Sequence, residues 1–359
     1  MTRCALDRRV FFVEEPEFGS QLTPRLRCEA AGAVTIVVPQ LPADLSPDAS
    51  REALRTLLDG MLHTHAISDY LLWYYTPMAL AYTDHLTPVA AVYDCMDELS
   101  AFKGAPAILK QFEVELMDRA DLVLTGGQSL YEAKRHQHRN IHPLPSSVDV
   151  GHFSRARRIS NDPLDQSTIP HPRLGFFGVI DERMDIALLD GVAAAKPDWH
   201  LVMLGPVVKI DPASLPQRPN IHYLGSKSYD ELPGYIAGWD VALLPFARNE
   251  ATRFISPTKT PEYMAAGKPV VSTSIRDVVR PYGQLGLVRI ADQVPVFVQA
   301  CDEAMAEDEA TRITQADAFL AHTSWDKTWS RIALLLDNLT QATDAEDVKQ
   351  AVAGSVTAP

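Results

Sequence analysis

The chain has 359 residues, of which 46% are hydrophobic and 22% charged, so it has an ordinary globular composition and enough length for two domains. Its formal net charge of −13 argues against broad nucleic-acid binding and against attraction of the whole surface to anionic lipid. No apolar run reaches the roughly 20 residues that span a bilayer, and the four cysteines lack CxxC spacing, which disfavours a disulfide framework and a cysteine-rich zinc site. We therefore expect a cytoplasmic protein with reduced thiols.

Short apolar, β-branched runs alternate with amphipathic stretches through the first half of the chain. This alternation is typical of βα units that feed a parallel sheet. Between two of the runs, apolar residues from Leu54 to Leu62 recur at i, i+3, i+4, i+7 and i+8, which predicts a helix with one buried stripe. The predicted strands are 9–15, 34–40, 70–75, 88–94, 121–127 and 140–146.

A polar stretch with several prolines and aspartates interrupts the alternation at 157–172, and we interpret it as a linker. It separates an N-terminal domain at 1–156 from a C-terminal domain at 173–323. Ligands of such sheets lie outside the carboxyl ends of the strands. The predicted strands of the second domain are 174–180, 200–206, 221–225, 240–246, 268–273 and 286–291.

The end of the chain carries one more helix. Ser324 is a suitable cap for a helix at 324–342, with Trp325 and Trp329 on its apolar face. The tail at 343–359 loses this pattern and is expected to be disordered. The arginines of the run 155–158 are interpreted first as a solvated linker, although a peripheral contact with the inner face of a membrane stays open.

The segment 240–273 predicts an anion site. Ser256 and Pro257 suit the start of a helix, and Gly267 suits its end. Free N–H groups and the positive end of the helix dipole favour an anion there, and Lys259 adds a full charge. Glu262, one turn further on, is a carboxylate that could accept two hydrogen bonds from vicinal hydroxyls such as those of ribose. A diphosphate beside a ribose is the core of a nucleotide sugar.

The run SPTKTPEYMAAGKPVVST (256–273) resembles the donor-site signature of GT-B glycosyltransferases, in particular the large retaining superfamily of the glycosyl transferase group 1 type. The runs FFGVIDERMDIALLDGVA, HLVMLGPV, NIHYLGSKSYDELPGYIAGWDVALLPF, VYDCMDELSAF and LPSSVDVGHF agree with it. The resemblance covers the chain from about Val10 to Leu336. It implies an α/β protein with two Rossmann-like domains that face a central cleft, and a C-terminal helix that crosses back to the first domain.

The resemblance also implies roles on the donor side. Glu262 would hold the nucleotide ribose, while Lys259 and the N–H groups of Thr258 to Thr260, at the helix start marked by Ser256, would hold the diphosphate. Arg183 would be a second phosphate contact.

Two glycines and two aspartates complete the candidate site. Gly178 would allow close backbone approach in the turn before Arg183, and Gly225 would border the base. In the acceptor-side domain, Asp97 and, ranked after it, Asp94 could orient an acceptor hydroxyl, take its proton or stabilise positive charge at the donor anomeric carbon.

The chain departs from the family pattern in two places. Many retaining members carry a second glutamate eight residues before the ribose-binding one, where this chain has Phe254. The chain also opens on what is usually a second strand, so a first βα unit is expected to be missing. The sugar contacts and the stereochemical outcome are therefore less defined than nucleotide binding.

Metal chemistry is not expected. No DxD-like pair follows a strand, and His136, His138 and His142 lack acidic partners in sequence. Lys259 and Arg183 would neutralise the leaving diphosphate instead, and the donor is a co-substrate, so no cofactor is predicted.

The predicted activity is transfer of a sugar from a nucleoside diphosphate, with uridine as the expected base and retention as the expected outcome. The acceptor would be a glycan, a lipid-linked saccharide or a small molecule. A non-catalytic nucleotide-sugar-binding subunit and a nucleotide-sugar epimerase are the alternatives.

Overall fold

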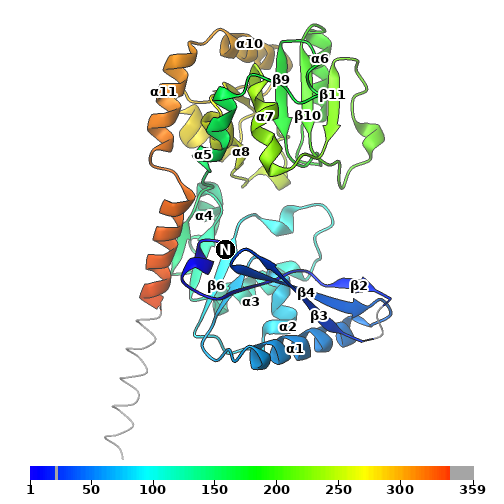
Figure 1. The fold of residues 1–359 in the computed structure, drawn as a ribbon, viewed down its shortest axis with the longest axis vertical. Coiled ribbons are helices and arrows are strands. Elements are labelled where there is room, and N and C mark those ends of the chain that lie inside the picture. Colours follow the sequence, from blue (N-terminus) through cyan, green and yellow to red (C-terminus); the bar gives the residue numbers. More distant parts are fainter. Residues whose placement is uncertain (21–22, 340–359) are drawn as a thin grey trace, which may run out of the picture. The chain divides into compact units, whose positions relative to one another are not determined.

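The computed structural model describes residues 1–20 and 23–339. By their contacts, the residues form two compact units (Figure 1). Among the described residues, the first contains Met1–Asp94, Ala107–Leu124 and 329–339, and the second contains Cys95–Pro106 and Thr125–Thr328. The boundary expected near 156 and the expected linker at 157–172 both fall inside the second unit.

The chain opens with a sheet of four strands, β1 (Val10–Val13), β2 (Glu17–Gly19), β3 (Arg25–Ala31) and β4 (Val34–Pro42). Both β1 and β2 run parallel to β4, and β3 pairs with β4 in the antiparallel sense. Gly32, at φ +62, makes the tight turn between β3 and β4. The predicted strands at 9–15 and 34–40 are confirmed, whereas β2 and β3 were not predicted. β1 is thus followed by two more strands before the first long helix.

That first long helix, α1 (Pro47–Thr64), has the predicted buried stripe. Ser46 caps it by accepting a hydrogen bond from the Ala49 N–H at 3.2 Å. Leu58 and Met61 pack with Val37 of β4 in one apolar cluster. The helical spacing of its apolar residues was sufficient to predict this element.

A second sheet has the order β5-β6-β7-β8. Each strand lies where an apolar run predicted one. The strands are β5 (Leu71–Tyr74), β6 (Ala90–Cys95), β7 (Leu122–Thr125) and β8 (Ile141–Pro143). The helices of this part of the chain are α2 (Leu80–Thr83), α3 (Leu109–Arg119), α4 (Gln128–Lys134) and the short 3₁₀ turn η3 (Leu99–Ala101).

The third sheet is parallel, with the order β11-β10-β9-β12-β13-β14. All six strands were predicted from their apolar runs. They are β9 (Arg173–Phe177), β10 (His200–Leu204), β11 (Ile221–Gly225), β12 (Val241–Leu244), β13 (Val270–Ser272) and β14 (Arg289–Ile290). After β9, the chain adds β10 and β11 on one side of β9, and it later adds β12 on the other side. Doubly wound sheets bind ligands where the strand order reverses in this way.

Helices surround this third sheet (Figure 1). They are α5 (Val150–Phe153), α6 (Ile186–Ala195), α7 (Leu232–Ala237), α8 (Lys259–Ala265), α9 (Arg276–Val278), α10 (Val294–Met305) and α11 (Glu309–Leu320). A large apolar core lies between sheet and helices, with Leu174, Val202, Leu243 and Val271 fully buried. The α/β fold class with parallel sheets is confirmed.

The stretch 157–172 packs into the second unit through Gln166. Its side chain is fully buried, donates to the Tyr235 carbonyl at 3.0 Å and accepts from the Trp239 indole N–H at 3.0 Å. Trp239 in turn covers β9 so closely that a Cβ on Gly175 would lie 1.9 Å from its ring. A polar composition suggested a solvated linker, but here the polar groups satisfy one another in the interior.

A helix at 325–339 follows α11. As predicted, Ser324 caps it, accepting from the Lys327 N–H at 3.2 Å. Its residues from Trp329 onward group with the first unit, where Asp337 pairs with Arg8 at 3.3 Å. Residues 340–342 of the predicted helix and the predicted tail at 343–359 lie outside the described residues. Within residues 1–20 and 23–339, no helix is both long and apolar enough to cross a membrane.

Candidate functional site

The candidate site is built on the turns that follow β9 and β12. Gly178 comes directly after β9 with φ +135, a conformation that only glycine adopts readily. Its N–H donates to the Leu204 carbonyl at 2.8 Å, which ties the turn to β10. A Cβ at this position would lie 2.3 Å from Cε and 2.7 Å from Nζ of Lys259. The backbone at Gly178 therefore approaches the lysine side chain as closely as a glycine permits.

Helix α8 begins later than predicted. It runs from Lys259, not Ser256, and has seven residues. Thr258 makes no side-chain cap, and the Thr260 N–H already donates to the Pro257 carbonyl at 3.1 Å. The helix has only two turns, and one of the N–H groups expected to bind an anion already has a hydrogen bond. The start of the helix is therefore a weaker anion site than predicted. The positive charge of the site therefore comes mainly from side chains.

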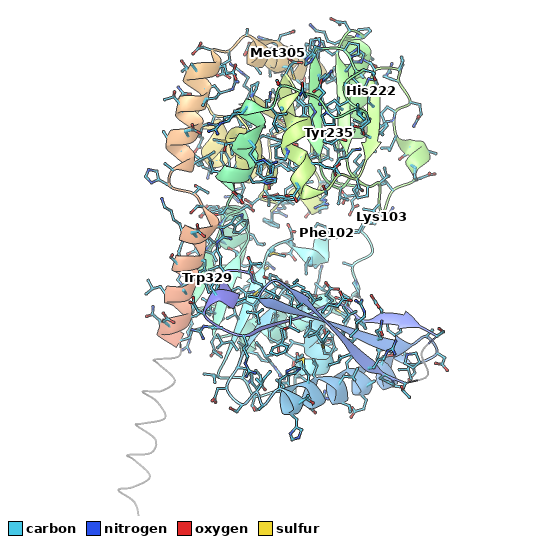
Figure 2. The ribbon with its side chains drawn as sticks, in the orientation of Figure 1. Phe102, Lys103, His222, Tyr235, Met305 and Trp329 are labelled. Atoms are coloured by element: carbon cyan, nitrogen blue, oxygen red, sulfur yellow. The ribbon has the colours of Figure 1, made fainter. Side chains whose placement is uncertain are left out.

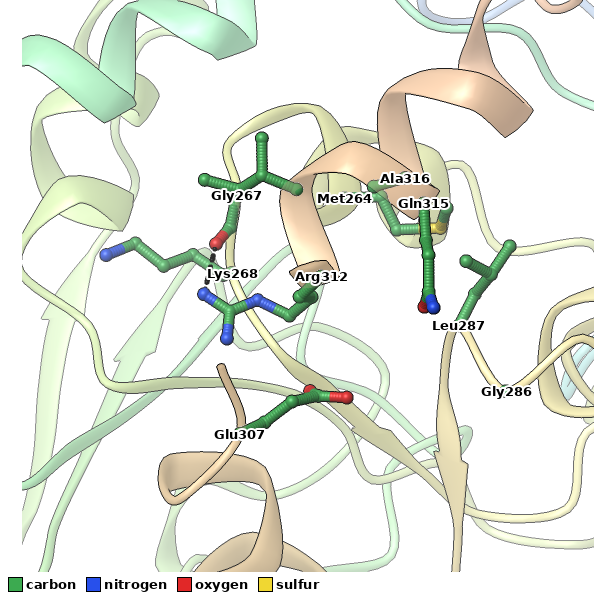
Figure 3. A pocket seen from close by; sticks show the side chains of 10 residues that line it. Met264, Gly267, Lys268, Gly286, Leu287, Glu307, Arg312, Gln315 and Ala316 are labelled. Atoms are coloured by element: carbon green, nitrogen blue, oxygen red, sulfur yellow. Dashed lines mark hydrogen bonds between the residues drawn. The ribbon is translucent and has the colours of Figure 1, made fainter. Parts of the chain in front are cut away.

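The other end of α8 is firmly held (Figure 3). Gly267, at φ +77, ends the helix as predicted. Its carbonyl accepts from Nη2 of Arg312 at 2.9 Å, and Lys268 donates to the Ala237 carbonyl at 2.8 Å. The cavity between these side chains measures about 10 Å³, room for one water molecule. Cations at the carboxyl end of a helix are favourable, so Arg312 stabilises the element that carries the site.

Lys259 and Glu262 form the centre of the site. Burial lowers the pKa of Lys259, and the nearby Glu262 carboxylate opposes this shift. Burial also raises the pKa of Glu262 to about 7, although Lys259 pulls it down. Among the described residues, neither Oε2 of Glu262 nor Oγ1 of the fully buried Thr260 has a hydrogen-bond partner. An unpaired buried acceptor costs about 1–3 kcal/mol, which a ligand hydroxyl could recover.

Arg183 lies in the turn after β9, where Asp181 holds it. Its Nε and Nη2 donate to Oδ1 and Oδ2 of Asp181 at 3.0 and 2.7 Å, and Asp181 is only 2% exposed. The hydrogen bonds to Asp181 raise the pKa of Arg183. Asp181 was not predicted, although an acid two residues before the arginine was a visible signal. Bidentate pairing fixes the guanidinium plane and leaves Nη1 without a partner among the described residues.

Asp97 is close enough to these cations to feel their charge. Burial raises its pKa, while Arg183 and Lys259 lower it. The 3₁₀ turn that follows begins at Glu98 without any side-chain cap, so Asp97 is not needed to start it. Asp94 belongs to the first unit, where it accepts from the Trp73 indole at 3.2 Å, and burial raises its pKa to about 6. Within the second unit, the structure thus places Asp97 near the charges of Lys259 and Arg183.

The remaining predicted residues lie around this group. Gly225 ends β11 at φ +70 with open space where a side chain would stand. The Ser256 carbonyl accepts from the Ser146 hydroxyl at 3.4 Å, and Thr258 is exposed. Phe254, in place of the second glutamate, is half-buried beside Arg253. Across the described part of the chain, no three His, Cys, Asp or Glu side chains are arranged to hold a metal ion.

The chain is similar to known glycosyltransferases in sequence and in fold. Residues 171–307 match the family described as "Glycosyl transferases group 1". TuaH of Bacillus subtilis (strain 168), whose name assigns it to teichuronic acid biosynthesis as a glycosyltransferase, is 24% identical over 279 residues, covering 72% of this chain and 69% of TuaH.

Solved structures are similar over most of their length. Sucrose-phosphate synthase from Thermosynechococcus elongatus has a TM-score of 0.71 at 14% identity, covering 95% of this chain and 91% of that one. Anabaena HepE, solved in complex with UDP and glucose, has a TM-score of 0.64 at 17% identity, covering 85% and 86%. The second half of the chain thus matches the glycosyl transferases of group 1, and the chain as a whole has the GT-B fold of these solved glycosyltransferases.

Proposed function

We propose that this glycosyltransferase uses a UDP-linked sugar as its donor. The observation that carries the proposal is the unpaired, buried Oε2 of Glu262 one turn from Lys259. A carboxylate with a free acceptor suits the two hydroxyls of a ribose, and an ammonium next to it suits a phosphate. Support for uridine comes from HepE, which was solved with UDP and with UDP-glucose.

In this proposal Lys259 and Arg183 neutralise the diphosphate as it leaves, without a divalent metal. Both cations have partners before the substrate arrives, Arg183 in Asp181 and Lys259 in the rings of Phe176 and Phe177, whose centroids lie 5.7 and 5.8 Å from its ammonium. Preorganised charge of this kind stabilises a leaving group without reorganisation during the reaction. Gly225 would border the base, and Ser256, Thr258 and Thr260 would line the approach to the phosphates.

Asp97 is proposed to act on the sugar side of the donor. Its carboxylate is held in the field of Arg183 and Lys259, which favours its ionised form against the effect of burial. An ionised carboxylate there can orient the acceptor hydroxyl or stabilise positive charge at the anomeric carbon. We expect transfer with retention of anomeric configuration, which NMR of the product anomeric proton would test.

The acceptor is proposed to be a glycan or a lipid-linked saccharide, since TuaH is named for the synthesis of a polymer, teichuronic acid. A lipid-linked acceptor would require a peripheral contact with the membrane. Arg155 and Arg158 are exposed and could supply one, whereas Arg157 is already paired with Asp317 at 2.7 Å.

The donor site is tested by titrating UDP, GDP and ADP by calorimetry against the wild type and Glu262→Ala. We expect UDP to bind most tightly and Glu262→Ala to weaken it at least tenfold. Glu250→Ala is the matched control, because that side chain is 78% exposed and lies on the same unit. Absence of binding by all three nucleotides would refute the proposal. Binding of UDP-sugar without transfer to any of a panel of acceptors would favour a non-catalytic binding subunit, and interconversion of free UDP-sugars would favour an epimerase.

A further inference from the structure

One aromatic ring contacts two cations at the edge of this site. Phe102, labelled in Figure 2, lies in the segment Cys95–Pro106. By its contacts, this segment groups with the second unit. Its ring centroid is 5.5 Å from Cζ of Arg183 and 5.1 Å from Nζ of Lys209. Both distances are within the range of about 6 Å in which a ring attracts a cation. The loop that carries Asp97 therefore also contacts a candidate phosphate-binding arginine.

The two cations come from neighbouring strands. Arg183 follows β9 and Lys209 follows β10, and the two turns are tied together by backbone hydrogen bonds. The Ile180 N–H donates to the Pro206 carbonyl at 2.9 Å, and the Val208 N–H donates to the Ile180 carbonyl at 3.1 Å. Lys209 itself has φ +62, a conformation uncommon for a residue with a side chain. The backbone of Lys209 thus lies in a constrained turn at the carboxyl end of the sheet.

The two cations differ in how the protein balances their charge, because Arg183 faces the carboxylates of Asp181, Asp97 and Glu182 and Lys209 has no ion pair among the described residues. Asp181 neutralises Arg183 through its Nε and Nη2 edge. Lys209 is exposed, and its ammonium has no hydrogen bond or ion pair with any described residue. Two cations against one ring repel each other unless an anion joins them. The groups left to bind such an anion are Nη1 of Arg183 and Nζ of Lys209.

We propose that Phe102 is a positioning residue that presents Arg183 and Lys209 together to the diphosphate of the donor, with Lys209 as a further phosphate contact. The inference rests on the proposed function, because it takes a nucleoside diphosphate as the ligand. In this proposal the loop 95–106 has two roles, because it supplies both Phe102 and Asp97. It also assigns a cation from the β10 turn to a site otherwise built from the turns after β9 and β12.

The test compares ligands that differ only in phosphate. Uridine, UMP and UDP are titrated by calorimetry against the wild type, Phe102→Leu, Phe102→Tyr and Lys209→Met. We expect Phe102→Leu and Lys209→Met each to weaken UDP about three- to tenfold and to leave uridine unchanged. Phe102→Tyr keeps the ring face and should stay within about twofold of the wild type. The affinity of Lys209→Met for UDP should also depend less on salt than that of the wild type.

Lys103→Met is the matched control, because Lys103 is exposed next to Phe102 and its ammonium makes no hydrogen bond or ion pair with any described residue. It should leave all three affinities unchanged. Equal weakening of uridine and UDP by Phe102→Leu would show a general structural effect and overturn the positioning role. Unchanged UDP affinity in Lys209→Met would overturn the phosphate contact. If the wild type binds neither uridine nor UDP, the proposed donor itself is refuted, which these variants distinguish from a failure of Phe102 and Lys209 alone.

Discussion

Replacing Glu262 by glutamine should make the unliganded protein more stable at pH 8 while weakening its binding of uridine. Burial raises the pKa of this carboxyl to about 7 from 4.5 in the unfolded chain. Between these values the folded protein keeps a proton that the unfolded chain has released. The contribution of Glu262 to the free energy of unfolding is therefore most favourable below pH 4.5 and is lost as the pH rises through 7.

The size of this effect follows from the two pKa values. The interval from 4.5 to about 7, at about 1.36 kcal/mol per pH unit, corresponds to about 3 kcal/mol. Glutamine has the same shape and no charge, so the Glu262→Gln variant should gain up to about 3 kcal/mol over the wild type at pH 8 and little at pH 5. The cost of ionising this group in the empty site is recovered when ribose hydroxyls donate to it. Removing a functional carboxyl whose ionisation is costly in the interior is therefore expected to give a more stable but inactive variant.

The assay is urea denaturation followed by fluorescence at pH 5, 6.5 and 8, together with uridine titration at each pH. Glu250→Gln removes the same charge from an exposed side chain and should show no comparable pH-dependent gain. Uridine affinity of the wild type should rise with pH through 7, and that of Glu262→Gln should stay low and flat. The reasoning is refuted if the stability difference between Glu262→Gln and the wild type is the same at pH 5 and pH 8.

Three further variants test the rest of the site. Lys259→Met should weaken UDP by tenfold or more but spare uridine, and it should raise the pKa of Glu262 further, which the pH dependence of stability would show. Gly178→Ala should cost about 1–3 kcal/mol in urea denaturation, because φ is +135 and the new methyl would lie 2.3 Å from Lys259; wild-type stability would contradict the close approach. Asp97→Asn should lower the turnover number about 10²- to 10⁴-fold in a UDP-release assay with UDP affinity kept. A larger loss in Asp94→Asn than in Asp97→Asn would reverse their ranking.

Buried parallel strands were predictable because their signal is local. Runs such as 241–244 and 270–272 are fully buried and apolar, and each was predicted within a few residues. β3 was missed although its residues, RLRCEAA, alternate between polar and apolar, because the run has one large aliphatic residue, Leu26, and is mostly exposed. β2 has only three residues and no turn signal that separates it from β1. Edge strands depend on pairing with a distant partner, which sequence patterns do not record.

The candidate site was predictable only in part, for a related reason. Lys259 and Glu262 share one helix, so their spacing alone indicated a common site. The close approach of the Lys259 side chain to Gly178 was not predictable, because Gly178 lies 81 positions earlier in the chain. Phe102 and Lys209 meet only in three dimensions, and nothing in either segment alone indicated that they share a contact with Arg183.

The packing of Trp239 on Gly175 has a consequence for variation among relatives. A methyl group at 175 cannot coexist with the indole, and the indole N–H needs the amide of Gln166. These three positions should therefore change together. A relative with alanine at 175 should carry a smaller ring or an aliphatic residue at 239. Without the indole, position 166 would no longer need an amide side chain. Sequences that keep glycine, tryptophan and glutamine together would mark the subset in which the segment before β9 is anchored inside the domain.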